Sequence, residues 1–292
     1  MESKETFAAW LESAPAESAS LASTMRWLAP CSSAVASLGC LERDALLALF
    51  LELVAPRLQP RYYTISSSKK CDGATVHVTV ALLDLPSPAK KKKGLCSGFL
   101  ADLRVGATCS AFVRASSFRA PRCAPAGGAP LVLVGPGTGV APMRAVLRER
   151  AAWATEDAGD ADLSGWKGAV SSATLYFGCK RRDQDHLYFE EMQDWLREGV
   201  LDTMQVAYSR QNEAKVYVQD LMRRPEDAER LRDQLLRQKG AVFVCGGTAM
   251  GNSVCDALRA IFAQEPGFDA RKAAEHVEQM QLDGRYVQEL WA

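Results

Sequence analysis

The stretch from residue 131 to residue 150, LVLVGPGTGVAPMRAVLRER, constrains the fold more than any other part of the chain. Its first four residues are apolar and predict a buried strand, and residues 141–150 predict a helix with Pro142 in its first turn. The glycines between them let the backbone approach an anion, and the helix N-terminus adds unpaired N–H groups. The spacing is neither G-x-G-x-x-G nor a Walker A box. The stretch predicts a phosphate-binding turn, with a purely structural turn as the alternative.

Strand and helix patterns alternate from this stretch to the C-terminus. Short apolar or β-branched runs each precede a longer segment with helical periodicity. Repeated units of this kind predict an α/β fold with a parallel doubly wound sheet, in which ligands bind at the carboxyl ends of the strands. The predicted strands are 131–134, 173–177, 203–208 and 241–245, and the further predicted helices are 184–198, 215–239, 248–263 and about 270–282.

The first half of the chain has a different pattern, with aromatic, β-branched and hydroxyl residues in short runs. The predicted strands are 61–68, 76–83 and 107–113. The sequence KKCDGA predicts a turn after the first of them, and residues 94–103 predict a short helix that follows a glycine. A Pro-, Gly- and Ala-rich connector at 116–130 predicts a domain boundary near residue 128. Residues 1–57 are expected to form a helical cap or connecting segment.

Composition and charge place the chain among globular proteins. Of its 292 residues 48% are hydrophobic and 24% charged, and the formal net charge of +0 gives no basic field for nucleic acid. The four lysines at 90–93 indicate a solvated loop, with a docking spot for an acidic partner as the alternative. The sequence shows no apolar run of membrane-spanning length and no signal peptide. Nine scattered cysteines without a C-x-x-C pair favour a reducing cytosol over a zinc site or a disulfide scaffold.

A dense group of polar side chains follows the third predicted strand of the second half. Ser209 and Arg210 come first, and Lys215 and Gln219 flank Tyr217 at a spacing that would put them on one face of a helix. These groups suit a phosphate dianion, and one charge-assisted hydrogen bond is worth roughly 1.5–3 kcal/mol. At a strand end of a dinucleotide-binding fold, the dianion would be the 2′-phosphate of NADP. The alternative is a solvated helix start with incidental charges.

Seven motifs occur in a fixed order, namely RYYTISSS, GLCS, VGPGTGVAP, YFGCKRRDQDHLY, YSRQNEAKVYVQ, VCGG and the C-terminal RYVQELWA. With them the chain resembles the FAD- and NADPH-binding half of the diflavin reductases, the family of NADPH–cytochrome P450 reductase. KGLCS and the closing ELWA are closer to the diflavin reductase of cytosolic iron–sulfur assembly. The resemblance implies a ferredoxin–NADP reductase-like fold, with a partial antiparallel FAD-binding β-barrel at 58–128 and a doubly wound NADPH-binding domain at 129–292.

The resemblance implies a flavin site in the first half. Arg61 is expected to pair with the FAD pyrophosphate, Tyr63 to stack on the isoalloxazine and Thr64 to lie near flavin N5. A guanidinium suits the anion and an aromatic face suits the flat ring, although Tyr63 by itself could be a core or edge aromatic. Further contacts are expected from the backbone of Thr79 and Ala81 and from the helix N-terminus at Gly94, Leu95, Cys96 and Ser97.

The resemblance also implies an NADPH site along the strand ends of the second half. A pyrophosphate loop is expected at 135–140, with Arg144 nearby. The matching residues are Gly137, Thr138 and Gly139 in that loop, Cys179 and Arg181 at the next strand end, and Ser209, Arg210, Lys215, Tyr217 and Gln219 at the 2′-phosphate and adenosine site.

Thr64, Cys245 and Glu289 match the hydride-transfer site of the family, and Trp291 matches the terminal aromatic that covers the flavin. A thiol at Cys245 would leave room for the nicotinamide, with a buried inert cysteine as the alternative. Glu289 stands where many relatives have Asp, so the carboxylate is kept on a longer side chain. Gly247 also stands where many relatives have Asp, and this second difference puts one contact to the nicotinamide side in doubt. Surface packing is the alternative for Trp291.

The resemblance implies an NADPH-dependent flavoprotein reductase, in which hydride passes from NADPH to FAD and electrons pass on to an FMN domain or a haem or iron–sulfur acceptor. No stretch resembles the FMN domain, and the 57 residues before the first barrel strand look helical. We therefore expect the C-terminal piece of a longer reductase, cytoplasmic or on the cytosolic face of the endoplasmic reticulum. The alternatives are an NADP-binding fragment or scaffold with weak FAD binding, and an independent ferredoxin–NADP reductase, which needs a complete barrel.

Overall fold

The computed structural model describes residues 58–85, 92–116, 118, 128–158 and 171–291. The chain divides into two compact units, Met1–Arg61 and Tyr62–Ala292. In the smaller unit the described residues are 58–61, where the Arg61 guanidinium donates to the carbonyl of Gln59 at 2.5 Å. The helical cap expected at 1–57 lies outside the described residues. The domain boundaries near residues 57 and 128 stay predictions.

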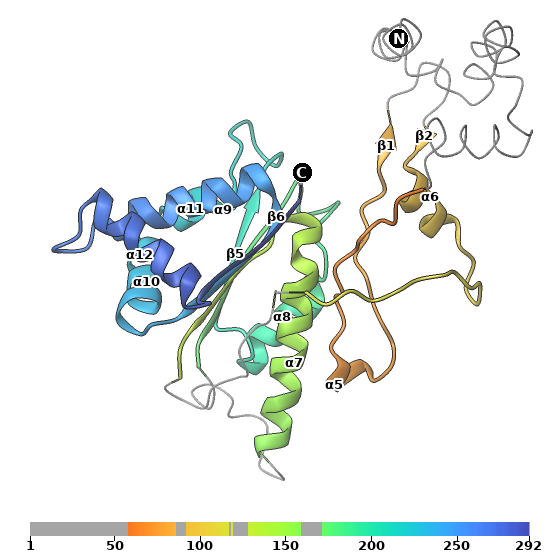
Figure 1. Ribbon diagram of the computed structural model, residues 1–292, viewed down its shortest axis with the longest axis horizontal. Coiled ribbons are helices and arrows are strands. Elements are labelled where there is room, and N and C mark those ends of the chain that lie inside the picture. Colours follow the sequence, from red (N-terminus) through yellow and green to blue (C-terminus); the bar gives the residue numbers. More distant parts are fainter. Residues whose placement is uncertain (1–57, 86–91, 117, 119–127, 159–170, 292) are drawn as a thin grey trace, which may run out of the picture. The chain divides into compact units, whose positions relative to one another are not determined.

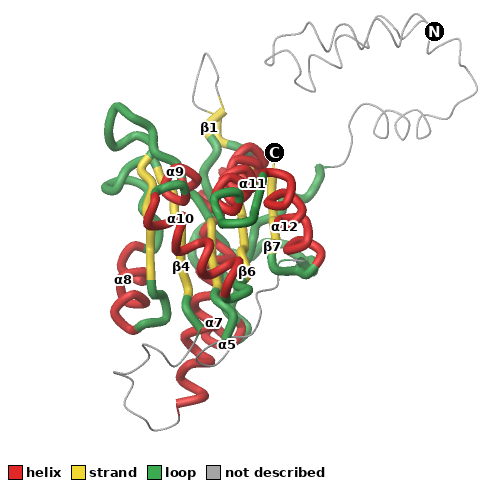
Figure 2. The backbone as a smooth tube through the Cα atoms, turned by 90° about the vertical axis from the view of Figure 1, so that its left-hand side faces the viewer, coloured by secondary structure: helices red, strands yellow, loops and turns green. Residues whose placement is uncertain are grey.

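A five-stranded parallel sheet forms the centre of the larger unit (Figure 2). Its strands lie in the order β5-β4-β3-β6-β7, so the chain builds outward from β3 in one direction and then crosses to the other side. This is the doubly wound arrangement that the alternating pattern predicts. The strands are β3 (Leu131–Val134), β4 (Ala173–Cys179), β5 (Thr203–Tyr208), β6 (Ala241–Gly247) and β7 (Tyr286–Trp291). The last of them was not predicted.

The two faces of the sheet are covered by different helices (Figure 1). Side chains alternate along a strand, so Leu131 and Leu133 pack in one apolar layer while Val132 and Val134 pack in the other. The first layer is covered by α7 (Val140–Ala158) and α8 (Phe189–Glu198). The second layer is covered by α9 (Val218–Met222), α10 (Pro225–Arg232), α11 (Thr248–Phe262) and α12 (Ala270–Leu282).

Two predicted helices differ from the structure for local reasons. The helix predicted at 215–239 is divided into α9, α10 and a π-helix, η4 (Asp233–Arg237), with Pro225 as the first residue of α10. The residue before a proline avoids the helical region, and Arg224 is extended. The helix predicted from residue 184 begins only at Phe189, because Tyr188 is left-handed with φ 56°. Among the described helices, none combines the length and the apolar surface that crossing a bilayer requires.

The strands predicted in the first half are largely wrong. Segments 61–68 and 76–83 share a single antiparallel bridge, between Ile65 and Val78, and segment 107–113 has no regular structure. A β-pattern becomes a strand only where a ladder partner is present, and few partners lie among the described residues of this half. Its elements are α5 (Lys69–Asp72) in the predicted turn, the antiparallel pair β1 (Asp84–Leu85) and β2 (Lys92–Lys93), and α6 (Leu95–Asp102), which was predicted.

The lysine run therefore extends into β2, and its first two members lie outside the described residues. Of the predicted partial barrel, the described part of the chain contains the β1–β2 pair and the Ile65–Val78 bridge.

Candidate nucleotide and flavin site

The predicted nucleotide-site residues of the second half lie at or just after the carboxyl ends of strands. In a parallel sheet these ends share one edge, so the topology gathers segments that are far apart in the sequence. The order of the strands reverses between β3 and β6, which is where ligands bind in sheets of this kind. The edge carries Gly137, Thr138 and Gly139 after β3, Cys179 and Arg181 at the end of β4, Ser209 and Arg210 after β5, Cys245 in β6, and Glu289 and Trp291 in β7.

The glycine loop after β3 rests on the backbone of β6. Gly137–Gly139 form a 3₁₀ turn, η2. A Cβ atom on Gly139 would lie 2.1 Å from the carbonyl oxygen of Cys245, and one on Gly135 would lie 2.4 Å from the carbonyl oxygen of Gly139. Packing alone therefore requires these two glycines. Gly137 is different, because its φ of +56° favours glycine while the space around it is open. A purely structural turn thus explains Gly135 and Gly139, whereas the open position at Gly137 suits a ligand.

The loops after β4 and β5 are tied together by backbone hydrogen bonds. Ser209 N–H donates to Cys179 O and Arg210 N–H to Lys180 O, both at 2.9 Å. Within the β4 loop the Asp185 carboxylate accepts from the N–H groups of Lys180 and Arg181, at 2.8–3.0 Å. The predicted residues at the end of β4, Cys179 and Arg181, therefore lie on a loop that is bonded to the loop of Ser209 and Arg210.

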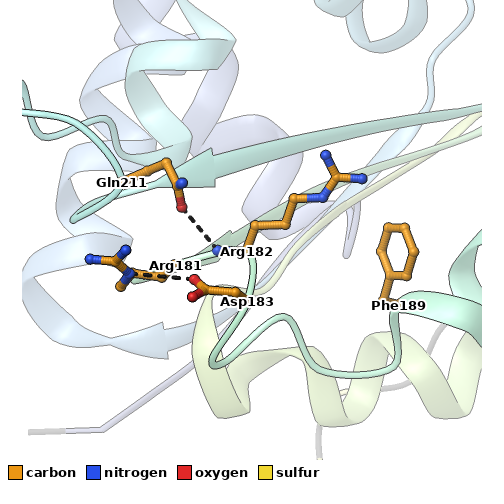
Figure 3. A pocket seen from close by; sticks show the side chains of 5 residues that line it. All are labelled: Arg181, Arg182, Asp183, Phe189 and Gln211. Carbon is orange, nitrogen blue, oxygen red and sulfur yellow. Dashed lines mark hydrogen bonds and ion pairs between the residues drawn. The ribbon is translucent and has the colours of Figure 1, made fainter.

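A pocket of 440 Å³ lies at these loops (Figure 3). It is lined by Arg181, Arg182, Asp183, Phe189 and Gln211. The Arg182 guanidinium lies 5.7 Å from the centroid of the Phe189 ring, and the Arg182 N–H donates to Gln211 Oε1 at 3.2 Å. Two guanidinium groups and an aromatic face in one pocket suit an anionic ligand with a flat ring. Sequence reasoning named Arg181 but missed Arg182, Phe189 and Gln211. The neighbouring basic residue in the KRR run was the available signal.

Ser209, Arg210, Lys215 and Tyr217 of the predicted 2′-phosphate cluster lie on the segment between β5 and α9, and Gln219 lies in α9. Lys215 precedes α9, so the helical face predicted for Lys215 and Gln219 is wrong. Tyr217 is extended and caps α9, and its N–H donates to the Asp220 carboxylate at 2.8 Å. Arg210, Lys215 and Tyr217 have exposed side chains that a ligand can reach. Gln219 is partly buried, and its Oε1 atom has no hydrogen-bond partner among the described residues.

Cys245 and Glu289 lie opposite each other in the parallel register of β6 and β7. Burial raises the pKa of the Cys245 thiol to about 12, with a smaller contribution from Glu289. Burial also raises the pKa of Glu289, against a smaller opposing effect of Arg114. Glu289 Oε2 is buried and finds no partner within the described part of the chain. A buried carboxyl oxygen in this state suits a polar ligand group next to a small, neutral thiol.

Trp291 ends β7 with its side chain 41% exposed. Its carbonyl accepts a hydrogen bond from Thr248 Oγ1 at 3.1 Å, which holds the end of β7 beside the start of α11. Cys179, at the end of β4, is also buried. Burial raises the pKa of its thiol to about 12, with a smaller contribution from Asp185. Neither Cys179 nor Cys245 is thus a thiolate near neutral pH.

The predicted flavin residues fall in both units of the chain. Arg61 belongs to the smaller unit, and Tyr63 and Thr64 are partly buried in the larger one. Thr79 Oγ1 lies 2.7 Å from the hydroxyl of Tyr188, while Ala81 is exposed.

The glycine turn before α6 is closely packed. Gly94 N–H donates to Leu83 O at 2.6 Å, and Ser97 Oγ accepts from Leu83 N–H at 3.2 Å. A Cβ atom on Gly94 would meet Ser97 Oγ at 2.8 Å. Leu95 is exposed and Cys96 partly buried at the start of this helix. A helix N-terminus that follows such a turn suits an anionic group.

Both halves of the chain match known families. Residues 133–256 match the oxidoreductase NAD-binding domain, and residues 43–99 match the FAD binding domain. Residues 43–57 of the second match lie outside the described residues. The matches bear out the expected flavin and pyridine nucleotide cofactors. A bound nucleotide would also supply a polar partner for the oxygens of Gln219 and Glu289, for which the described residues provide none.

The relatives of the chain are larger proteins. The chain is 36% identical over 247 residues to the inducible nitric oxide synthase of Canis lupus familiaris, which covers 83% of the chain and 20% of that protein. It is 32% identical over 243 residues to NADPH–cytochrome P450 reductase of Drosophila melanogaster, and 34% over 245 residues to that of Homo sapiens. These two alignments cover 81% of the chain and 33% and 34% of the relatives. The chain therefore has the FAD-binding and NAD-binding domains of flavoprotein oxidoreductases, and it is similar in sequence to the NADPH–cytochrome P450 reductases and to inducible nitric oxide synthase.

Proposed function

We propose that the chain is the nucleotide-binding part of an NADPH-dependent reductase that passes electrons through FAD to an FMN domain or to a haem or iron–sulfur acceptor. When bound, NADPH supplies the hydride and FAD accepts it. The observation that carries the proposal is the carboxyl edge of the sheet. There the ends of five adjacent strands present an open glycine position, a guanidinium-rich loop pair and the buried Cys245 opposite the partly buried Glu289.

The residues at this edge divide the work of binding. Ser209, Arg210, Lys215 and Tyr217 hold the 2′-phosphate with charge-assisted hydrogen bonds, and the loop at Gly137 admits the pyrophosphate. Cys245 leaves space for the nicotinamide ring, and Glu289 orients its polar group. Trp291 covers the flavin face. In the first half Arg61, Tyr63, Thr64, the backbone of Thr79 and Ala81, and the turn at Gly94–Ser97 contact FAD. These assignments rest on the family motifs, since the residues fit the chemistry that each contact requires.

A second candidate function is an NADP-binding module with little independent activity. It is favoured by the described flavin half, in which apolar side chains such as Leu82, Leu95 and Phe99 are exposed and the described ladder is one two-residue pair. The chain also spans only about a fifth to a third of the relatives it matches. A stoichiometric amount of bound FAD in the purified protein, measured by its visible absorbance, would exclude this module.

The proposed function is tested by replacing Arg210 with alanine. Loss of one charge-assisted bond of roughly 1.5–3 kcal/mol should weaken NADP⁺ binding about tenfold to a hundredfold. NAD⁺ lacks the 2′-phosphate, so its affinity should stay nearly unchanged. Titration calorimetry of the full chain with both nucleotides measures the two effects.

The matched control is Arg223→Ala, which removes an exposed guanidinium just after α9. It should leave both affinities unchanged. An equal loss of NADP⁺ and NAD⁺ affinity in Arg210→Ala would refute the 2′-phosphate assignment.

A further inference from the structure

Four charged side chains join the first half of the chain to the helices on one face of the sheet. Arg148 of α7 makes two hydrogen bonds to the Asp72 carboxylate of α5, at 2.7 and 3.1 Å, and a third to Glu191 of α8 at 2.7 Å. Arg144, one helical turn earlier, makes two bonds to the same Glu191 carboxylate, at 2.6 and 3.1 Å. Two cations and two anions thus form one continuous network, which we call the latch.

Arg144 extends the latch to the backbone of the first half. Its Nη1 atom donates to the Ser66 carbonyl at 2.8 Å, and its guanidinium lies 4.6 Å from the centroid of the Tyr188 ring. The Tyr188 hydroxyl is in turn 2.7 Å from Thr79 Oγ1. Segment 66–79 is therefore held at its start and in its middle by arginines of α7, and at its end by Tyr188, the residue before α8.

The latch is shielded from water. The side chains of Asp72, Arg144, Glu191 and Arg148 are only 8%, 11%, 22% and 24% exposed. By comparison, the surface pair Arg271–Glu275 is 73% and 56% exposed. Hydrogen bonds from Arg148 hold the pKa of Asp72 below its ordinary value. Bidentate pairs of this kind fix geometry more than they add net stability, because desolvation offsets much of the attraction.

Polar groups make this junction because segment 66–79 has few apolar side chains to bury. The buried residues of the segment are Ser66, Ser67 and Ser68. Ser66 N–H donates to His77 O at 2.8 Å, and His77 N–H donates to Ser67 Oγ at 3.0 Å, which closes the segment on itself. The latch supplies the attachment that an apolar core supplies elsewhere.

We infer that the latch is a positioning device, which sets the flavin side of the reductase at a fixed place on the nucleotide-binding sheet. Tyr63, Thr64 and Thr79, the residues proposed to meet the flavin, flank or belong to the segment that the latch holds. Asp72, Arg144, Arg148 and Glu191 are positioning residues, because they act through that segment. The positioning of segment 66–79 stands on the contacts alone, and its role toward the flavin rests on the proposed function.

The test is hydrogen–deuterium exchange of the full chain without flavin or nucleotide. Glu191→Gln removes the carboxylate shared by both arginines, and we expect amide exchange across 66–79 to rise at least about tenfold. Exchange in β3, β4 and β6 should not change. The control is Glu190→Gln, which neutralises the exposed neighbour on α8 and should leave both regions unaltered.

A second variant guards against misfolding of the first. Asp72→Asn changes the far end of the latch, on α5, together with the bond that Asp72 accepts from Ser68 N–H at 2.9 Å, and should release the same segment. Arg148→Lys keeps the charge but loses the bidentate geometry, so its effect should be intermediate. Unchanged exchange across 66–79 in both carboxylate variants, or an equal rise throughout the sheet, would overturn the inference.

The outcome separates the latch from the proposed function. The exchange experiment contains no cofactor, so it does not depend on the Arg210 result. In the Glu191→Gln variant the ratio of the NADP⁺ affinity to the NAD⁺ affinity should equal that of the unmodified chain, because the latch lies outside the 2′-phosphate loop. A change in that ratio would show that Glu191 supports the 2′-phosphate site itself and would refute a role confined to the flavin side.

Discussion

The two regions of the larger unit bury their side chains in different ways. In the sheet region, 128–291, every residue of β3 and β4 is buried, and apolar layers cover both faces. In the described residues of 58–116, the buried side chains are serines, while many large apolar side chains are exposed. Among the described residues of the sheet region, the exposed large apolar ones are Phe189, Tyr217, Leu282 and Trp291.

Exposed large apolar side chains thus indicate different things in the two regions. Phe189 lines the pocket, and Tyr217 and Trp291 are proposed ligand contacts, so exposure there coincides with the proposed binding site. Exposure across 58–113 is too widespread for a single site. It indicates a β-structure whose ladder partners are missing from the described residues. A βαβ unit covers its own strands, whereas an antiparallel barrel depends on strands from distant parts of a chain.

The comparison is tested most severely by truncating one phenylalanine in each region. Phe243 of β6 is fully buried and meets Phe118 at 5.2 Å between ring centroids. Phe243→Ala should lower the free energy of unfolding by about 3–5 kcal/mol. Phe112 is 65% exposed, so Phe112→Ala should cost less than about 1 kcal/mol. Chemical denaturation monitored by circular dichroism measures both. A similar cost at Phe112 would show that the first region has an apolar core of its own.

Cysteine reactivity sharpens the comparison with a smaller effect. With the pKa of Cys245 at about 12, roughly one thiol in ten thousand is ionised at pH 8. Cys109 is exposed. We expect iodoacetamide to alkylate Cys109 at least about a hundredfold faster, as measured by peptide mass spectrometry. Because the pKa of Cys245 is raised, its labelling should increase as pH rises toward 10. Equal rates at pH 8 would mean that β6 opens readily.

The smallest effect concerns the glycine loop within the sheet region. A methyl group on Gly139 meets a backbone carbonyl at 2.1 Å, so Gly139→Ala should cost about 1–3 kcal/mol and displace the loop. Gly247 has φ −67°, and the atom nearest to an added Cβ, the Trp291 carbonyl oxygen, would be 4.0 Å away. Gly247→Ala should therefore stay within about 0.5 kcal/mol in thermal unfolding. A neutral Gly139→Ala would contradict the packing of the loop on β6.

The sequence predicted the sheet region better than the first region for a physical reason. The strands at 131–134 and 203–208 and the helix at 270–282 have the predicted bounds, because local periodicity decides them. The strands at 61–68 and 107–113 depend on partners that no local pattern reveals. The strand β7 was missed because its place is set by pairing with β6, more than 40 residues earlier.

The candidate site followed the same division. Motifs identified residues at strand ends, but the assumption of a continuous helix misplaced Lys215, since Pro225 and the extended Tyr217 limit α9 to five residues. The latch could not be predicted. Asp72, Arg148 and Glu191 lie far apart in the sequence and belong to no common motif, and only the tertiary structure brings them together.

The contact between Gly139 and the Cys245 carbonyl has a consequence for the choice of substrate. In the proposed function, the glycine loop binds the pyrophosphate in the middle of the nucleotide, and Cys245 lies at its nicotinamide end. The contact joins these two supports, so the distance between them is fixed. A mononucleotide would reach only one of these supports. Under the proposed function, tight binding therefore requires a ligand long enough to reach both supports. We expect shorter pyridine compounds to be poor electron donors, whatever the reactivity of their rings.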